Sequence, residues 1–401
     1  MSERYDSIVV GGGLLGAALA WMLAREGARV ALLERDQLNQ HASGQNAGSL
    51  HFQLEYRMVE HGWESARTAA EAMPLHLEAA REWAALGDEL GESLGVAQQG
   101  GFMLAETAEQ VEVLRRKTAL EQEWGLDVRL LDGDEARRLA PYLSDSVLAA
   151  AFCPLEGKAD TRIAGPALAR GALRLGAEVR TRTEVVDLVP AATGWAVHAV
   201  ERSEAGERML RLEADTVMLA AGVWTTRLGQ LLDVSLPTIP LALMMSVSAP
   251  TAPFVPHLVQ HAGTKLSLKQ TGNGTVLIGG GWPARLPLAA DGTPDLESRP
   301  TLLQSSLVGN AAAAIGVVPR TASLPIVRSW VGTTTVTPDQ LPLVGQVPGR
   351  PGVFVATGGS AFTLGPSFAR SLIALADGRP PGIDLHPYDP ARFERLSHAR
   401  R

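Results

Sequence analysis

The chain has 401 residues, a formal net charge of −7, 46% hydrophobic residues and 20% charged residues. This length favours two lobes over one hydrophobic core, and the acidic balance argues against a nucleic-acid or anionic-membrane partner. The single cysteine, Cys153, excludes an internal disulfide and a cysteine-rich zinc or iron–sulfur site. Because no long uncharged apolar run and no leader pattern occur, we expect no membrane span and a cytoplasmic location.

The chain opens with a βαβ unit, comprising a buried strand over 6–12, a helix over 14–27 and a second strand over 28–36. Gly11, Gly13 and Gly16 fall between the first strand and the helix with the spacing G-x-G-x-x-G. These glycines permit a tight turn, close approach of a pyrophosphate and close packing of the helix. Glu34 ends the second strand, where an acid hydrogen-bonds a ribose hydroxyl and disfavours a 2′-phosphate. The pattern predicts a site for FAD or NAD, not NADP.

The later part of the chain is predicted to alternate between helix-plus-strand units and antiparallel strands. Helical spacing covers 55–91, a strand 100–107 and a charged helix 108–125, and Asp132 is expected to cap a short helix. Helix-plus-strand units return at 165–190 and 214–232. Apolar runs between 237 and 281, with a Gly–Asn–Gly turn at 272–274, predict antiparallel strands. A helix is expected within 301–316, and a strand and glycine loop at 353–359 precede a helix that starts at Pro366.

This alternation predicts an α/β fold with an α+β substrate lobe. A Rossmann-like FAD/NAD(P)-binding domain is expected from 1–90, 145–232 and 320–401, and an antiparallel-sheet substrate domain from 91–144 and 233–319. Two observations favour FAD over NAD. An NAD dehydrogenase usually continues with regular βα alternation, whereas this chain departs into long helices. Buried strands at 217–224 and 353–359 also end in small-residue turns, as in flavoproteins. The dipole of the last helix would stabilise negative charge on a reduced flavin.

An ordered set of motifs resembles the D-amino acid oxidase family, which includes glycine and sarcosine oxidases and flavoprotein subunits of D-hydroxyproline and opine dehydrogenases. The set comprises the opening fingerprint, "SGQNAG", "LEGKADTRIAGPALARGA", "LAAGVWT", "SWVGTTTVTPDQLPLVG" and the final "ATGG…LGP". The resemblance implies a p-hydroxybenzoate-hydroxylase-like two-domain fold and one FAD. It also implies oxidation of the carbon–nitrogen bond of an amino acid or small primary or secondary amine, by hydride transfer to flavin N5 to give an imine.

The fingerprint and the resemblance together assign a set of cofactor-binding residues. They are Gly11, Gly13, Leu14, Leu15, Gly16, Glu34, Arg35, Ser43, Gly44, Asn46, Ala47, Gly48, Ser49, Val185, Ala221, Gly222, Trp224, Gly332, Gly358, Gly359, Phe362, Thr363 and Leu364. For the loop 43–49 the alternative is a polar turn held by its own asparagine and serine side chains.

The sequence departs from the family pattern at three places. Gly332 stands where covalent members carry a cysteine, so we expect noncovalent FAD. The segments that often supply a carboxylate-binding arginine carry Thr333, Thr334 and Thr363 instead. An arginine fork is the usual carboxylate ligand, so this departure weakens the prediction of a simple α-amino acid substrate. Arg57 and Arg328 are the other candidates for the carboxylate-binding arginine, although Arg328 is equally suited to a structural ion pair. Lysines near the flavin assist oxygen in sarcosine-oxidase-like members, and Lys269 is a better candidate than Lys265.

His51, Lys269 and Arg328 are the predicted catalytic residues. His51 follows the 43–49 loop and is expected to meet the substrate, with a packed structural histidine as the alternative. His41 is expected to touch cofactor phosphate or ribose, and an exposed strand position is the alternative for Lys269. The histidine spacing predicts no metal site, and no serine–histidine–aspartate set emerges from the sequence.

The expected partners are a small-molecule substrate and either oxygen or an electron-accepting protein. Two alternatives stay open at this point. One is a flavoprotein subunit of a heteromeric amino-acid or opine dehydrogenase that passes electrons to a partner chain. The other is a flavin-binding protein without catalysis.

Overall fold

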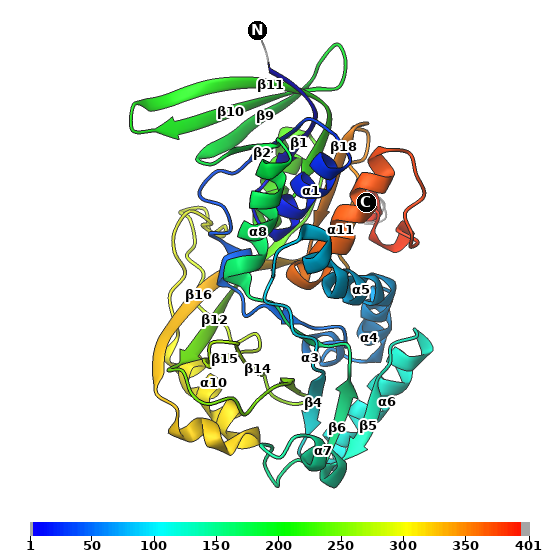
Figure 1. The fold of residues 1–401 in the computed structure, drawn as a ribbon, viewed down its shortest axis with the longest axis vertical. Helices are drawn as coiled ribbons and strands as arrows, with labels where there is room; N and C mark the ends of the chain where they lie inside the picture. The colour runs from blue at the N-terminus through cyan, green and yellow to red at the C-terminus, as the bar shows by residue number, and fades with distance from the viewer. Residues whose placement is uncertain (1–2, 394–401) are drawn as a thin grey trace.

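The computed structural model describes residues 3–393. Two large sheets lie one above the other along the long axis of the molecule (Figure 1). Short strands β3 (Ser49–Leu50) and β7 (Gly157–Lys158) pair between them. This arrangement confirms the predicted α/β class with two lobes. No helix in the described range is both long enough and apolar enough to span a lipid bilayer.

The first sheet is built on the predicted βαβ unit and is largely parallel. Its path β17-β18-β11-β1-β2-β8 comprises β17 (Leu343–Gln346), β18 (Val353–Thr357), β11 (Gly206–Leu219), β1 (Glu3–Val10), β2 (Val30–Leu33) and β8 (Glu178–Arg180). Val9 of β1 faces one core cluster, whereas Ile8 and Val10 face another. Burial on both faces explains why the strand has a continuous apolar sequence. β9 (Thr183–Pro190) and β10 (Trp195–Ser203) extend from β11 as an antiparallel arm (Figure 1).

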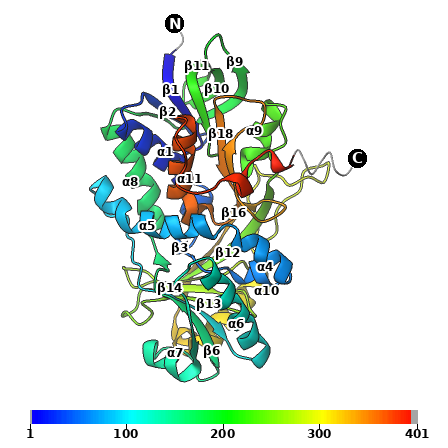
Figure 2. The same ribbon diagram turned by 90° about the vertical axis from the view of Figure 1, so that its right-hand side faces the viewer.

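Three helices cover one face of this sheet, namely α1 (Leu14–Arg25), α8 (Thr161–Arg174) and α11 (Ala361–Ala376), and α5 (Met73–Leu90) packs on α11 (Figures 1 and 2). α1 is buried from Leu14 to Ala24, as expected for a helix that is apolar all round. A Cβ at Gly16 would lie 1.7 Å from the Gly11 carbonyl oxygen, so this crossing requires glycine. η1 (Gly222–Trp224) and α9 (Thr225–Leu231) follow β11.

The second sheet has the order β16-β12-β15-β14-β13-β4-β6-β5. Its strands are β4 (Gly101–Ala105), β5 (Arg129–Asp132), β6 (Ala149–Cys153), β12 (Ile239–Ser248), β13 (Leu258–His261), β14 (Ser267–Gln270), β15 (Val276–Gly279) and β16 (Ile326–Val336). α7 (Gly133–Leu139) and α10 (Gln304–Val317) share one core cluster with this sheet. α6 (Ala108–Glu123) packs on β4 and β6 through the core cluster that also contains Val9 of β1. The remaining short elements are α2 (Ala42–Gln45), α3 (Tyr56–Val59), α4 (Trp63–Ala70), η2 (Pro319–Ser323) and η3 (His386–Tyr388).

Several local predictions are confirmed. The Gly–Asn–Gly turn joins antiparallel β14 and β15. Asp132 caps α7 and forms a capping box with Glu135. Others are wrong in detail, because the helical segment 55–91 divides into α3, α4 and α5, and β13 runs parallel to β4. α11 begins at Ala361, after Ser360 in a left-handed conformation (φ 60°), so Pro366 lies inside the helix instead of at its start.

Strand pairing also departs from the predicted domain boundaries. β6 pairs with β4 and β5, and β16 pairs with β12, so both strands belong to the second sheet. The predicted boundaries assign residues 145–232 and 320–401 to the nucleotide-binding domain. The difference arises because the partner of a strand is set by long-range packing, which its own sequence does not encode.

Candidate cofactor and substrate site

A cavity of about 920 Å³ lies between the two sheets. Its walls come from the turn after β1, the segment 39–49, the loop after β18, and strands β12 and β16. The volume falls in the range of cofactor and small-molecule sites, which commonly form where two lobes meet.

The glycine turn forms one end of the cavity. A Cβ at Gly11 (φ +111°) would lie 2.5 Å from the Ala220 carbonyl oxygen, and one at Gly13 would lie 2.8 Å from Ser43 Oγ. Ser43 Oγ accepts a hydrogen bond from the Leu14 amide (2.9 Å) at the start of α1. Glycine at these positions therefore keeps the backbone accessible to a bound phosphate group.

The Glu34 carboxylate lies beside this turn and is buried. It accepts hydrogen bonds from the Gly12 amide (2.6 Å) and the Asp36 amide (2.8 Å). Asp36 in turn contacts His41 Nε2 (2.7 Å). Ligand atoms of Glu34, Asp36 and His41 all lie within 4.8 Å of one another, a convergence that the sequence spacing did not reveal. Because both oxygens of Glu34 already bind amide hydrogens, we assign the cluster to the nucleotide end and not to a metal.

Trp224 gives this end an unpaired donor. Its Nε1 is buried and has no hydrogen-bond partner among residues 3–393, although the residue lines the cavity. Its ring lies 4.9 Å from the Arg35 guanidinium and 4.7 Å from the His41 ring. Since buried donors are normally paired, this atom and the glycine turn fit a bound dinucleotide cofactor such as FAD.

The 42–49 loop is held by its own side chains and also faces the cavity. Asn46 Nδ2 donates to the carbonyls of Ala42 and Ser43 (both 2.8 Å), and Asn46 Oδ1 accepts from the Gly48 amide (2.6 Å). The polar-turn interpretation is therefore correct for Asn46. The loop is nevertheless part of the cavity wall, so the two interpretations are compatible.

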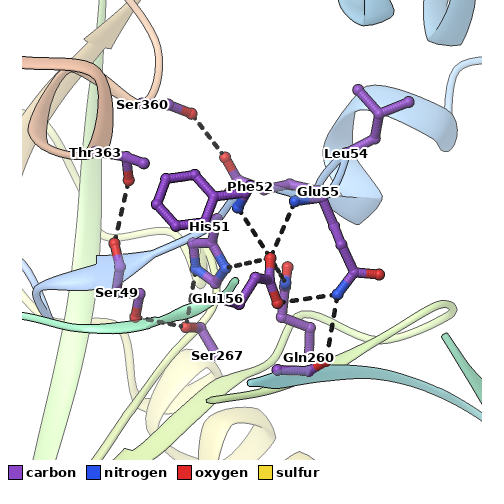
Figure 3. Close-up of polar contacts among 12 residues, drawn as sticks. Ser49, His51, Phe52, Leu54, Glu55, Glu156, Gln260, Ser267, Ser360 and Thr363 are labelled. Carbon is purple, nitrogen blue, oxygen red and sulfur yellow. Dashed lines mark hydrogen bonds and ion pairs between the residues drawn. The ribbon is translucent and has the colours of Figure 1, made fainter. Parts of the chain in front are cut away.

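The last glycine loop, which follows β18 and contains Gly358 and Gly359, forms the opposite wall of the cavity. The Thr363 hydroxyl donates to the Ser49 carbonyl (3.2 Å), which ties the start of α11 to the 42–49 loop (Figure 3). Trp83 Nε1 donates to the Thr363 carbonyl (2.7 Å) from α5. Gly332 lines the cavity across from Gln45, and Cys153 is buried in β6 outside it.

Most predicted cofactor-binding residues line this one cavity. They are Gly11, Gly13, Leu15, Glu34, Arg35, Ser43, Asn46, Ala47, Ser49, Val185, Ala221, Gly222, Trp224, Gly332, Gly358, Gly359, Phe362 and Thr363. The predicted residues that do not form its wall lie behind it or pack on neighbouring backbone, namely Leu14, Gly16, Gly44, Gly48 and Leu364.

Arg57 lines the cavity beside the last glycine loop. Its Nη2 donates to Glu55 Oε1 (2.9 Å) and Ser360 Oγ (3.2 Å), and its Nη1 donates to Gln340 Oε1 (3.0 Å). Burial opposes the charged form of Glu55, but the Arg57 guanidinium holds the pKa of that carboxyl down at about 2. The sequence did not identify Glu55, although it stands two positions from Arg57.

Arg328 is not part of the site. It is exposed on β16, with its guanidinium 5.8 Å from the Trp330 ring, and it does not line the cavity. The structure therefore gives no support to its predicted catalytic role. The alternation of a strand turns its side chain outward, a property that strand register decides.

Lys269 is buried in β14 and lies outside the cavity wall. Its Nζ donates to Ser49 Oγ (3.3 Å), and burial lowers the pKa of its amine well below the usual value. The exposed-strand alternative for Lys269 is therefore wrong. Lys265, the less favoured candidate, lines the cavity instead.

His51 lines the cavity with a side chain that is 12% exposed. Its Nε2 lies 3.2 Å from Ser267 Oγ and its Nδ1 lies 4.0 Å from Glu156 Oε1 (Figure 3). Burial lowers the pKa of this imidazole to about 4, so it is neutral at pH 7. The His51 carbonyl binds His76 Nδ1 (3.1 Å).

Glu156 forms the centre of a buried network that sequence reasoning missed. Its carboxylate binds the amides of Phe52 (3.0 Å) and Gln53 (3.1 Å) and the side chains of Gln53 (2.9 Å) and Gln260 (3.4 Å). Burial raises the pKa of Glu156 to about 7 despite these donors. The only sequence signal is an acid inside the motif "LEGKAD", and nothing local shows that it is buried.

Comparisons with known proteins agree with the geometry. The family model described as DAO, FAD dependent oxidoreductase, matches residues 6–375. The chain is 29% identical to glycine oxidase of Geobacillus kaustophilus over 400 residues, covering 98% of each chain. It is 26% identical to an opine oxidase subunit of Rhizobium meliloti over 398 residues, covering 97% of this chain and 98% of that one. The crystal structure of the Geobacillus kaustophilus glycine oxidase superposes with a TM-score of 0.83 at 26% identity, covering 98% and 99% of the two chains.

Proposed function

This chain belongs to the DAO family of FAD-dependent oxidoreductases, and on that premise we propose that it holds FAD noncovalently and oxidises an amino acid whose carboxylate binds Arg57. It is an FAD-dependent enzyme that oxidises carbon–nitrogen bonds in amino acids or amines. FAD, when bound, accepts a hydride from the substrate carbon, and the protein positions the substrate and excludes water.

Noncovalent binding is supported by the side chains around the cavity. Gly332 offers no thiol, and the only cysteine, Cys153, is buried in β6. The glycine turn and Glu34 would hold the nucleotide end of FAD, and the unpaired Trp224 Nε1 would donate to the cofactor there. The start of α11 would complement negative charge on the flavin.

The substrate assignment is carried by the free hydrogen-bonding capacity of Arg57. A guanidinium has five N–H groups, and three of them bind Glu55, Gln340 and Ser360. Two N–H groups therefore have no partner within the described residues. These contacts fix the orientation of the guanidinium, so a carboxylate can bind without ordering a mobile side chain.

Anaerobic flavin reduction with and without Arg57 tests this assignment. Glycine, sarcosine, D-alanine and D-proline are compared with methylamine and pyrrolidine, which lack the carboxylate. Arg57→Gln should raise the amino-acid concentration for half-maximal reduction by about 100-fold, the loss expected for charge-assisted hydrogen bonds, and should leave the simple amines unaffected. Arg328→Gln, an exposed arginine on β16, is the matched control. Equal effects of Arg57→Gln on both substrate classes would reject the carboxylate clamp.

A second candidate is supported by the similarity to the opine oxidase subunit of Rhizobium meliloti. In this case the chain is a flavoprotein subunit that passes electrons to a partner protein instead of oxygen. Purified chain incubated with substrate in air distinguishes the two. Rapid hydrogen peroxide formation supports an autonomous oxidase, whereas flavin that bleaches but reoxidises slowly supports the partner-dependent enzyme.

A further inference from the structure

We propose that Ser267, His51 and Glu156 form a proton relay that removes a proton from the substrate's ammonium group before its carbon–hydrogen bond is oxidised. This inference rests on the proposed function, because it concerns the same substrate. An ammonium nitrogen has no lone pair to form a carbon–nitrogen double bond, so the amine has to lose a proton first.

The three residues are brought together from distant segments on the floor of the cavity. Ser267 and His51 line the cavity, and Glu156 lies behind them with no exposed surface. Ser267 Oγ lies 3.2 Å from His51 Nε2, and Glu156 Oε1 lies 4.0 Å from His51 Nδ1 (Figure 3). His51 Nδ1 has no hydrogen-bond partner within residues 3–393. The order of groups is a hydroxyl, an imidazole and a carboxylate beyond the imidazole, as in activated-hydroxyl sites.

The hydrogen bonds around Ser267 give the relay a direction. Lys269 Nζ donates to Ser49 Oγ (3.3 Å), and Ser49 Oγ lies 3.1 Å from Ser267 Oγ. With its acceptor side used by Lys269, the Ser49 hydroxyl can donate to Ser267. The Ser267 hydrogen is then directed at His51 Nε2, which places the imidazole proton on Nδ1, facing Glu156.

The carboxylate is held by donors that fix its position. Phe52, Gln53 and Gln260 supply them, and Gln260 itself lines the cavity. Burial raises the pKa of Glu156 to about 7 and lowers that of His51 to about 4. His51 is therefore a neutral conduit, and Glu156 has a proton affinity suited to a general base near pH 7. The other titratable or charged groups facing the pair are Glu55, Arg57, His76, Lys117, Glu121, Cys153 and Lys269.

The proton steps balance without an oxidant. The ammonium N–H bond breaks and its electron pair stays on nitrogen, while the proton bonds to Ser267 Oγ. The original Ser267 hydroxyl proton moves to His51 Nε2, and the Nδ1 proton moves to Glu156 Oε1. For the last step the 4.0 Å separation has to shorten by about 1 Å to hydrogen-bond distance.

Stopped-flow flavin reduction as a function of pH tests the relay. The probe is whichever of glycine, sarcosine, D-alanine and D-proline reduces the wild-type flavin fastest. Ser267→Ala and His51→Gln should slow reduction about 100-fold at neutral pH, within the usual contribution of a general base. The loss should shrink to within a few-fold above the pKa of the substrate amine, where the relay is not needed. Ser267→Thr retains a hydroxyl and should recover most of the rate.

Ser246→Ala is the matched control, because Ser246 is a buried strand serine bonded to Ser329 Oγ (2.9 Å) outside the cavity wall. A loss that is equal at all pH values, or no loss, would overturn the relay. Failure of every probe to bleach the wild-type flavin at any pH would instead reject the proposed function.

A measurement on the substrate-free protein checks the same inference without turnover. Nitrogen-15 NMR of the His51 ring should show the Nδ1–H tautomer with an unprotonated Nε2. A His51 ring that carries its proton on Nε2 would contradict the direction of the relay.

Discussion

Lys117 Nζ lies 2.6 Å from Glu121 Oε1 on α6, and neither side chain is exposed to solvent. Lys117 also donates to Gln53 Oε1 (3.0 Å), and Glu121 accepts from the Leu54 amide (2.6 Å). A buried ion pair thus anchors the chain segment that carries His51 into the cavity. The pair lies on a helix that packs on β4 and β6 of the second sheet, yet it holds the segment that lines the cavity between the two sheets.

Removal of one partner of this pair should destabilise the protein strongly. Lys117→Met leaves the Glu121 carboxylate buried without its counter-ion, and we expect a loss of about 3–5 kcal/mol in the free energy of unfolding. Urea unfolding of the holoenzyme measures it. Arg115→Ala, which breaks the exposed pair with Glu112 (3.3 Å) on the same helix, should change stability by no more than about 0.5 kcal/mol. Similar losses in the two variants would contradict the argument.

His76 should contribute to acid sensitivity. Burial lowers the pKa of His76 from 6.5 to about 4, so between these values the unfolded chain binds a proton that the folded chain does not. The contribution of His76 to stability is therefore fully present above pH 6.5 and is lost as the pH falls towards 4. His76→Gln should reduce the slope of unfolding free energy against pH by up to about 1.4 kcal/mol per pH unit. Urea unfolding across this range checks it, and an unchanged slope in His76→Gln would contradict the assignment.

Gly16 should be intolerant of any side chain. A Cβ there would lie 1.7 Å from the Gly11 carbonyl oxygen, so Gly16→Ala has to separate α1 from the nucleotide turn. We expect protein with little bound flavin and lower stability, measured by flavin absorbance per mole of protein and thermal unfolding. Gly316 in α10 has no atom within 4 Å of a Cβ, so Gly316→Ala should stabilise the protein by about 0.5–1 kcal/mol and retain full flavin. Normal flavin content in Gly16→Ala would refute this account.

Trp224 should donate a hydrogen bond to the cofactor. Trp224→Phe removes the unpaired Nε1 and keeps most of the ring, so FAD affinity should fall about threefold to tenfold. Fluorescence titration of the apoprotein with FAD gives this value. Trp195 Nε1 already binds the Pro351 carbonyl (2.8 Å), so Trp195→Phe should alter stability without altering FAD affinity. An unchanged affinity in Trp224→Phe would show that Nε1 does not meet FAD.

The nucleotide-binding unit and the locally encoded turns could be predicted from the sequence alone. Gly11, Gly13, Gly16 and Glu34 lie within one βαβ unit, where backbone sterics and strand–helix spacing dictate the geometry. The Asp132 cap and the Gly–Asn–Gly hairpin were predictable for the same reason, since each depends on neighbours a few positions away.

The polar side chains that meet at the cavity floor could not be predicted from the sequence, because long-range packing brings them together. His51 and Ser267 are separated by 216 positions, and Phe52 and Glu156 by 104. Their contacts depend on which face of a strand is buried and on which strands pair, and a one-residue shift of register would turn each side chain to the opposite face. The same dependence applies to Arg328 and Lys269. Strand alternation and packing leave the Arg328 side chain exposed and bury the Lys269 side chain beneath Ser49.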